Sequence, residues 1–248
     1  MSYKYTLNEK YTSFENELLN IKDIFQNSNE SIHKARNELK VIELHEIKCV
    51  VKAFKVPHII NRIAYTFFRE GKAKKSYNNA IKLQQLNVNT PEPIGIIEFF
   101  QTGLLSQSFF IARYEPYDFT IREVFHHKVD DVEEILKQFA KFTYEIHQKG
   151  VWHVDYSLGN ILISKQDDGK YKFSLVDINR MEFKEITPQE GLKNFNKFWA
   201  KFDEDLPLIA KEYAKLADFD ENEAVNIVLN EAKALEDRIN LKRKLKGR

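Results

Sequence analysis

Four short, mostly apolar segments are separated by polar turn residues in a pattern that is typical of strands. The first pair, residues 38–44 and 48–54, is rich in β-branched side chains and is separated by a short polar turn. The second pair, 94–100 and 108–114, is joined through a glycine. Between the two pairs, residues 72–86 place apolar side chains near one stripe at helical spacing, and a Pro-Glu-Pro sequence ends this predicted helix.

The second half of the chain has a different pattern. Residues 130–148 predict a strongly amphipathic helix, with Gly150 placed as its C-terminal cap. An Asp-Gly turn between apolar runs predicts a hairpin over 161–176, and most of 188–248 reads as helical. This order favours an α+β fold with two lobes, a small N-terminal β-sheet lobe with one helix and a mostly helical C-terminal lobe.

Composition narrows the class of protein. The chain has 248 residues, a formal net charge of +1 and 43% hydrophobic residues, which indicates a soluble globular protein and argues against a general nucleic-acid binder. No apolar run approaches the roughly 20 residues that a bilayer-spanning helix needs. The single cysteine, Cys49, excludes an intramolecular disulfide, and a cytoplasmic location is the simplest expectation.

One short segment carries candidate chemistry. His153 is followed by Asp155 and then by Asn160, and an apolar strand begins directly afterwards. Asp177 comes at the end of the second hairpin strand. An aspartate in a loop can accept the proton of an attacking hydroxyl, and an Asn and an Asp can hold Mg²⁺ through their oxygens. With Lys52 on a strand to neutralise nucleotide phosphates, the set predicts phosphoryl transfer.

These spacings resemble the protein-kinase-like superfamily. The finer pattern is similar to the lipopolysaccharide kinase family of the Kdo/WaaP type, and the likeness spans roughly residues 30–181. It is carried, besides the catalytic loop, by the sequences VVKAFK (50–55), KAKKSYNNA (72–80) with TPEPIG (90–95), and DINRM (177–181).

The resemblance implies a protein-kinase-like fold and a role for each residue. Asp155 would be the catalytic base, Asn160 and Asp177 the Mg²⁺ ligands, and Lys52 the contact to the α- and β-phosphates of ATP. His153 would anchor the catalytic loop. One kinase-like domain would comprise an N-lobe over 1–114 and a C-lobe over 115–248. The adenine would meet the backbone of a hinge that includes Ala112, Tyr114 and Glu115.

Three positions depart from the family pattern. Residues 28–36, where a phosphate-covering loop is expected, contain no glycine, so that Lys34 or Arg36 would supply charge there instead. Asn78 stands where a helix glutamate would orient the lysine. Asn179 replaces the glycine that usually follows the metal aspartate, and asparagine tolerates the left-handed backbone conformation that such a turn needs. Arg180 is either a surface charge or a substrate or turn residue.

The predicted function is transfer of the ATP γ-phosphoryl group to a sugar hydroxyl, on a Kdo or heptose of the lipopolysaccharide inner core. The alternatives are a kinase for a protein or another small molecule, and a pseudokinase-like nucleotide-binding scaffold. The predicted partner is a glycolipid or sugar acceptor, with no nucleic acid. The last eleven residues carry six basic side chains and no acid. This tail is either a solvated end or a peripheral contact with the cytoplasmic face of the inner membrane.

Overall fold

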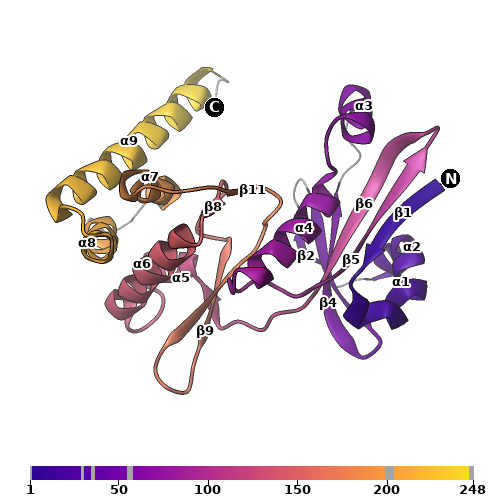
Figure 1. Ribbon diagram of the computed structural model, residues 1–248, viewed down its shortest axis with the longest axis horizontal. Helices are drawn as coiled ribbons and strands as arrows, with labels where there is room; N and C mark the ends of the chain where they lie inside the picture. The colour runs from indigo at the N-terminus through magenta and orange to yellow at the C-terminus, as the bar shows by residue number, and fades with distance from the viewer. Residues whose placement is uncertain (1, 29–30, 35–36, 55–57, 199–203, 246–248) are drawn as a thin grey trace. The chain divides into compact units, whose positions relative to one another are not determined.

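The computed structural model describes residues 2–28, 31–34, 37–54, 58–198 and 204–245, without the side chains of 31–34 (Figure 1). The chain divides into two compact units, residues 1–115 and 116–248, and each is described by itself.

Unit 1 is built on a six-stranded antiparallel sheet with the order β1-β5-β6-β4-β3-β2. The four strands that the sequence predicts are all present. The full set is β1 (Ser2–Leu7), β2 (Ser31–Lys34), β3 (Glu38–Leu44), β4 (Ile47–Phe54), β5 (Pro93–Gln101) and β6 (Leu104–Arg113).

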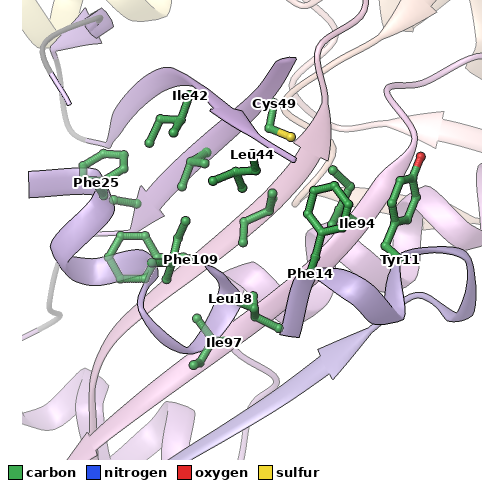
Figure 2. Packing of buried hydrophobic residues seen from close by; sticks show 14 of the residues in the cluster. Tyr11, Phe14, Leu18, Phe25, Ile42, Leu44, Cys49, Ile94, Ile97 and Phe109 are labelled. Atoms are coloured by element: carbon green, nitrogen blue, oxygen red, sulfur yellow. The ribbon is translucent and has the colours of Figure 1, made fainter. Parts of the chain in front are cut away.

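One face of this sheet is covered by the N-terminal segment. The 3₁₀ helix η1 (Glu9–Phe14) and the helices α1 (Glu15–Leu19) and α2 (Ile21–Asn27) place Phe14, Leu18 and Phe25 on the sheet. Figure 2 shows these side chains packed over residues of β3, β4, β5 and β6, among them Cys49 and Phe109. The buried Cys49 thiol therefore belongs to the core, and burial raises its pKa to about 11.

The opposite face of the sheet packs against α4 (Lys72–Gln85), the helix that the sequence predicts. Ala73 and Tyr77 of α4 contact Phe54 of β4 and Ile96 of β5. A further helix, α3 (Ile59–Phe67), packs against β6 and has no buried residue.

The prediction of a single helix in the N-terminal part is wrong, since α1, α2 and α3 accompany α4. The reason is physical. Helices of five and seven residues, such as α1 and α2, show too few turns for a clear apolar period, and they are stabilised by packing on the sheet rather than by their own propensity.

Unit 2 combines a three-stranded sheet, β10-β9-β7, and a two-stranded sheet, β11-β8, with helices around an aromatic core. Phe139 of α6 lies at the centre and packs against Tyr156, Phe173, Phe195 and Phe198. The elements are β7 (Phe119–Thr120), α5 (Ile121–Phe125), α6 (Val132–Gln148), β8 (Val151–His153), β9 (Ile161–Lys165), β10 (Tyr171–Leu175), β11 (Met181–Phe183), α7 (Pro188–Lys193), the 3₁₀ helix η2 (Asn194–Lys197), α8 (Asp205–Ala217) and α9 (Glu221–Leu245).

The predicted helix, hairpin and helical C-terminal segment are thus confirmed, and Gly150 caps α6 with a φ of 71°. The α+β fold class is also confirmed. Within the part of the chain that the structure describes, no helix is both long enough and apolar enough to span a bilayer.

Candidate active site

Two loops of unit 2 meet at one end of its strands. The first, 154–160, connects β8 to β9, and the second, 176–180, connects β10 to β11. Because β8 pairs with β11 and β9 pairs with β10, both antiparallel, the two loops start and finish at the same end of these pairs. Residues 16 or more positions apart in the sequence are thereby brought side by side.

Backbone and side-chain hydrogen bonds tie the loops together. The Val176 N–H donates to the Asn160 carbonyl at 3.0 Å, and the Val154 N–H donates to the Arg180 carbonyl at 3.1 Å. Nε2 of His153 lies 3.0 Å from the Val176 carbonyl, to which it must donate. The relative positions of the two loops are therefore fixed at three points.

The buried His153 is neutral. Burial lowers the pKa of its imidazole, and Nδ1 has no hydrogen-bond partner among the described residues. With the proton on Nε2 committed to the Val176 carbonyl, the ring holds the second loop and has no proton to exchange with a substrate.

The Asp155 carboxylate is held between two cations. Lys197 Nζ donates to Asp155 Oδ1 at 3.1 Å and to the Val154 carbonyl at 2.7 Å. Arg180 Nη1 lies 3.2 Å from Asp155 Oδ2. The Asp155 side chain is 30% exposed, so that its carboxylate is oriented by the protein and still open to a reactant.

A buried polar network explains why Lys197 is so placed. Asn194, at the start of η2, donates from Nδ2 to the His153 carbonyl at 3.2 Å. Its Oδ1 lies 3.2 Å from His147 Nε2, and His147 Nδ1 lies 2.9 Å from the Tyr213 hydroxyl. This chain of bonds fixes η2 against α6, α8 and the catalytic loop, and Lys197 is one turn further along the same short helix.

Asn160 and Asp177 form an oxygen donor set that fits Mg²⁺. Nδ2 of Asn160 donates to the Asp155 carbonyl at 2.8 Å, which leaves the amide oxygen as the atom able to bind a cation. Nδ2 of Asn179 donates to Asp177 Oδ1 at 2.5 Å and orients that carboxylate. One amide oxygen and one carboxylate are what Mg²⁺ commonly takes from a protein when substrate phosphates and water complete its shell.

The left-handed residue of this turn is Asp177 itself, with a φ of 55°. The prediction that Asn179 takes this conformation is therefore wrong. Aspartate, like asparagine, tolerates a positive φ because its short polar side chain can bond locally, and here the local partner is the Asn179 amide.

Lys52 lies on β4 in unit 1, on the sheet face that packs against α4. It pairs across the sheet with Phe110, and Phe110 pairs with Ile96, so that all three point to this face. The Lys52 ammonium lies 5.5 Å from the centre of the Phe54 ring, and only 8% of the residue is exposed. The aliphatic stem is thus packed among apolar neighbours, which restricts where the charged end can reach.

The predicted hinge has well-defined backbone partners. Ala112 is buried in β6 and pairs with Val50 of β4. The Tyr114 N–H donates to the Lys48 carbonyl at 2.8 Å and is therefore not available to an adenine. Glu115 is the last residue of unit 1.

The structure does not describe the side chains of the two basic residues predicted to cover the phosphates. Lys34 ends β2, but its side chain is not among those described, and Arg36 lies outside the described residues. Asn78 is exposed on α4 and donates to Glu70 Oε1 at 2.7 Å, as expected for a surface residue.

Lys197 and Asn194 are the residues that sequence reasoning missed. Neither lies in a recognisable motif, and both lie more than 30 residues beyond the catalytic loop. The only local signal is an Asn at the start of a segment whose aromatic residues are spaced for burial.

Comparisons with known proteins agree with this geometry. The sequence model of the lipopolysaccharide kinase (Kdo/WaaP) family matches residues 56–219, which is more than half of the chain. The chain belongs to this family. It is accordingly a kinase, a transferase of lipopolysaccharide biosynthesis. No curated protein matches the sequence.

A solved structure described as WaaP in complex with acyl carrier protein has the same fold. It is 13% identical in sequence, with a TM-score of 0.62 over 95% of this chain and 97% of that one. At such a low identity the likeness concerns the fold alone, and it confirms the kinase-like architecture.

Proposed function

We propose that this kinase transfers the γ-phosphoryl group of ATP to a sugar hydroxyl of the lipopolysaccharide inner core, on a Kdo or a heptose. The family membership supports a sugar or glycolipid acceptor. The observation that carries the chemistry is the pair of tied loops, which holds Asp155 beside Asn160 and Asp177 in unit 2.

In the proposed step, the acceptor hydroxyl gives its proton to an Asp155 carboxylate oxygen while its own oxygen bonds to the γ-phosphorus. The bond between that phosphorus and the bridging oxygen of ADP breaks, and ADP leaves. Lys197 and Arg180 hold the carboxylate in the orientation that receives the proton. They are positioning residues, since the contacts shown are to Asp155.

Charge neutralisation falls to the other residues. Asn160 and Asp177 would hold Mg²⁺, which would supply positive charge near the phosphate oxygens. Lys52 would contact the α- and β-phosphates. Lys34 and Arg36 stay proposed as further phosphate contacts, and the hinge would meet adenine through the Tyr114 carbonyl and Glu115, because the Tyr114 N–H is already bonded.

We further propose that the enzyme works in the cytoplasm, with a peripheral contact to the inner membrane through its basic tail. The final turns of α9 support this proposal, because Arg238, Lys242, Arg243 and Lys244 are exposed there together with Leu241 and Leu245. Basic residues near an anionic surface contribute about 1 kcal/mol each.

The function is tested by mass spectrometry of core lipopolysaccharide from cells with and without the gene. Deletion should remove a phosphate from one core sugar, and the intact gene should restore it. The Asp155→Asn variant should not restore it, since a general base contributes about 10²- to 10⁴-fold to the rate. Identical lipopolysaccharide from all strains would refute the proposed acceptor. Full complementation by Asp155→Asn would refute the proposed base.

A further inference from the structure

Helix α3 is attached to unit 1 by its polar side chains. Arg62 Nε donates to the Leu105 carbonyl at 2.8 Å, and Arg62 Nη2 donates to the Gln101 carbonyl at 3.2 Å. One turn later, the Thr66 hydroxyl accepts from the Leu105 N–H at 3.0 Å. The polar stripe of the helix is thus bonded to the hairpin of β5 and β6, beside which α3 lies (Figure 1).

The apolar stripe of α3 faces outward. Five large apolar residues of this segment are exposed, namely Ile59 (57%), Ile60 (77%), Ile63 (42%), Phe67 (67%) and Phe68 (82%). A surface helix of a globular protein normally has the reverse arrangement, with its apolar stripe against the core. Leaving these side chains in water is unfavourable, and a contiguous apolar surface of this kind usually marks a contact with another phase or molecule.

The charges around α3 favour an anionic partner. Between residues 55 and 75 the sequence has one acidic side chain, Glu70, and five basic side chains besides the hairpin-bonded Arg62, in a chain whose total net charge is only +1. Arg69, Lys74 and Lys75 are exposed. A ridge of Ile and Phe with basic flanks is typical of helices that lie in the headgroup region of anionic membranes.

We propose that α3 is a membrane-docking helix that inserts Ile60, Phe67 and Phe68 among the acyl chains of an anionic bilayer, with its basic flanks against the headgroups. A second copy of the chain is a poorer occupant, because it would bring two basic segments together. The helix and the C-terminal tail lie in different units, so that each contact can be removed separately.

Co-sedimentation with vesicles of phosphatidylethanolamine and phosphatidylglycerol tests the proposal, with the full chain and without ATP or acceptor. The variant Ile60→Ser/Phe68→Ser should bind about 100-fold more weakly, since each buried apolar side chain of this size contributes about tenfold or more. The matched control is Leu216→Ser/Leu229→Ser, which removes two apolar residues that are 41% and 42% exposed on α8 and α9, and it should bind as the unaltered chain does.

A second variant, Phe68→Trp, keeps a large apolar side chain at this position, so that its result does not depend on whether the serine variant folds. Trp emission of Phe68→Trp should shift to shorter wavelength when vesicles are added, beyond the change shown by the unaltered chain, whose tryptophans are Trp152 and Trp199. Vesicle binding that is equal in the Ile60→Ser/Phe68→Ser variant, or the lack of a shift, would overturn the proposal. Two further results would also overturn it. One is that the unaltered chain forms a dimer that the Ile60→Ser/Phe68→Ser substitutions dissociate, and the other is that the unaltered chain binds an acidic protein but does not bind vesicles. None of these readouts depends on phosphoryl transfer, so the proposed function stands or fails separately.

Discussion

Replacing Lys197 by methionine tests the proposed control of the catalytic base most directly. Methionine keeps the length and packing of the aliphatic stem and removes only the ammonium group. Two charge-assisted bonds are lost with it, at 2.7 Å to the Val154 carbonyl and at 3.1 Å to Asp155 Oδ1. The Asp155 carboxylate then keeps its contact with Arg180 and is free to turn toward it.

The magnitude follows from distance and exposure. At 3.1 Å, the attraction between two unit charges is about 1 kcal/mol in bulk water and about 5 kcal/mol at an effective dielectric constant of 20. The Lys197 and Asp155 side chains are 33% and 30% exposed, which places the pair between these limits, and solvent screening lowers the net value further. About 1.5–2 kcal/mol of the attraction therefore remains to hold the carboxylate. Its loss in Lys197→Met corresponds to a decrease of about 10- to 30-fold in kcat.

Arg180 provides the matched control. It contacts the same carboxylate at 3.2 Å, but its side chain is 57% exposed. A pair of this kind typically contributes less than about 1 kcal/mol, so Arg180→Met should decrease kcat by less than about fivefold. The assay is transfer of labelled γ-phosphate from ATP to core lipopolysaccharide from cells that lack the gene. The KM for ATP should stay unchanged in both variants.

Combining Lys197→Met with Asp155→Asn distinguishes whether Lys197 positions the base or acts directly on the transferred phosphate. If Lys197 acts through Asp155, then Lys197→Met should slow the Asp155→Asn enzyme by less than about threefold, because the group that it positions is already absent. A decrease of the same size in both backgrounds would refute the reasoning and would place the ammonium on the transferred phosphate. Thermal unfolding of each variant shows whether loss of the bond to Val154 has loosened the loop.

Three other measurements test other parts of the structure. ATP should bind weakly without Mg²⁺ and tighter with it, and calorimetry should show that Asp177→Ala removes most of the difference; equal affinity in both conditions would contradict the metal assignment. Deleting residues 238–248 should weaken binding to acidic vesicles at low salt and leave phosphorylation of a soluble acceptor fragment nearly unchanged, whereas equal sedimentation would show that the tail is only a solvated end. Burial lowers the pKa of His147 from 6.5 to about 4. Between pH 4 and pH 6.5, His147 therefore binds a proton in the unfolded state and is neutral in the folded state. The free energy of unfolding should therefore fall by up to about 3 kcal/mol as the pH decreases from about 6.5 to 4, and a flat profile, or one that His147→Gln does not flatten, would contradict a buried neutral imidazole.

The sequence alone predicted those features that local pattern controls. The strands of 38–54 and 94–114 follow from short apolar runs bounded by turn residues, because β-branched and aromatic side chains fit a buried sheet whatever lies upon it. The helix at 130–148 is long enough for its period to be evident. The spacing of His153, Asp155 and Asn160 could also be recognised from the sequence, since these residues lie in one short loop whose chemistry depends on their order along the chain.

The tertiary structure decided everything that depends on distant segments. Lys197 reaches Asp155 only because a buried network through Asn194, His147 and Tyr213 fixes η2 against the loop, and no local pattern encodes such a contact. The left-handed conformation of Asp177 was likewise set by its bond to Asn179 and by the hydrogen bonds between the loops.

Helix α3 shows the same division between sequence and structure. Its amphipathic period is present in the sequence, but a period does not reveal which stripe meets the protein. That was decided by the carbonyls of Gln101 and Leu105, which bind the Arg62 guanidinium. Hydrogen bonds formed between segments far apart in the chain therefore determine the orientation of this helix, which the sequence-based prediction of a single N-lobe helix had left out.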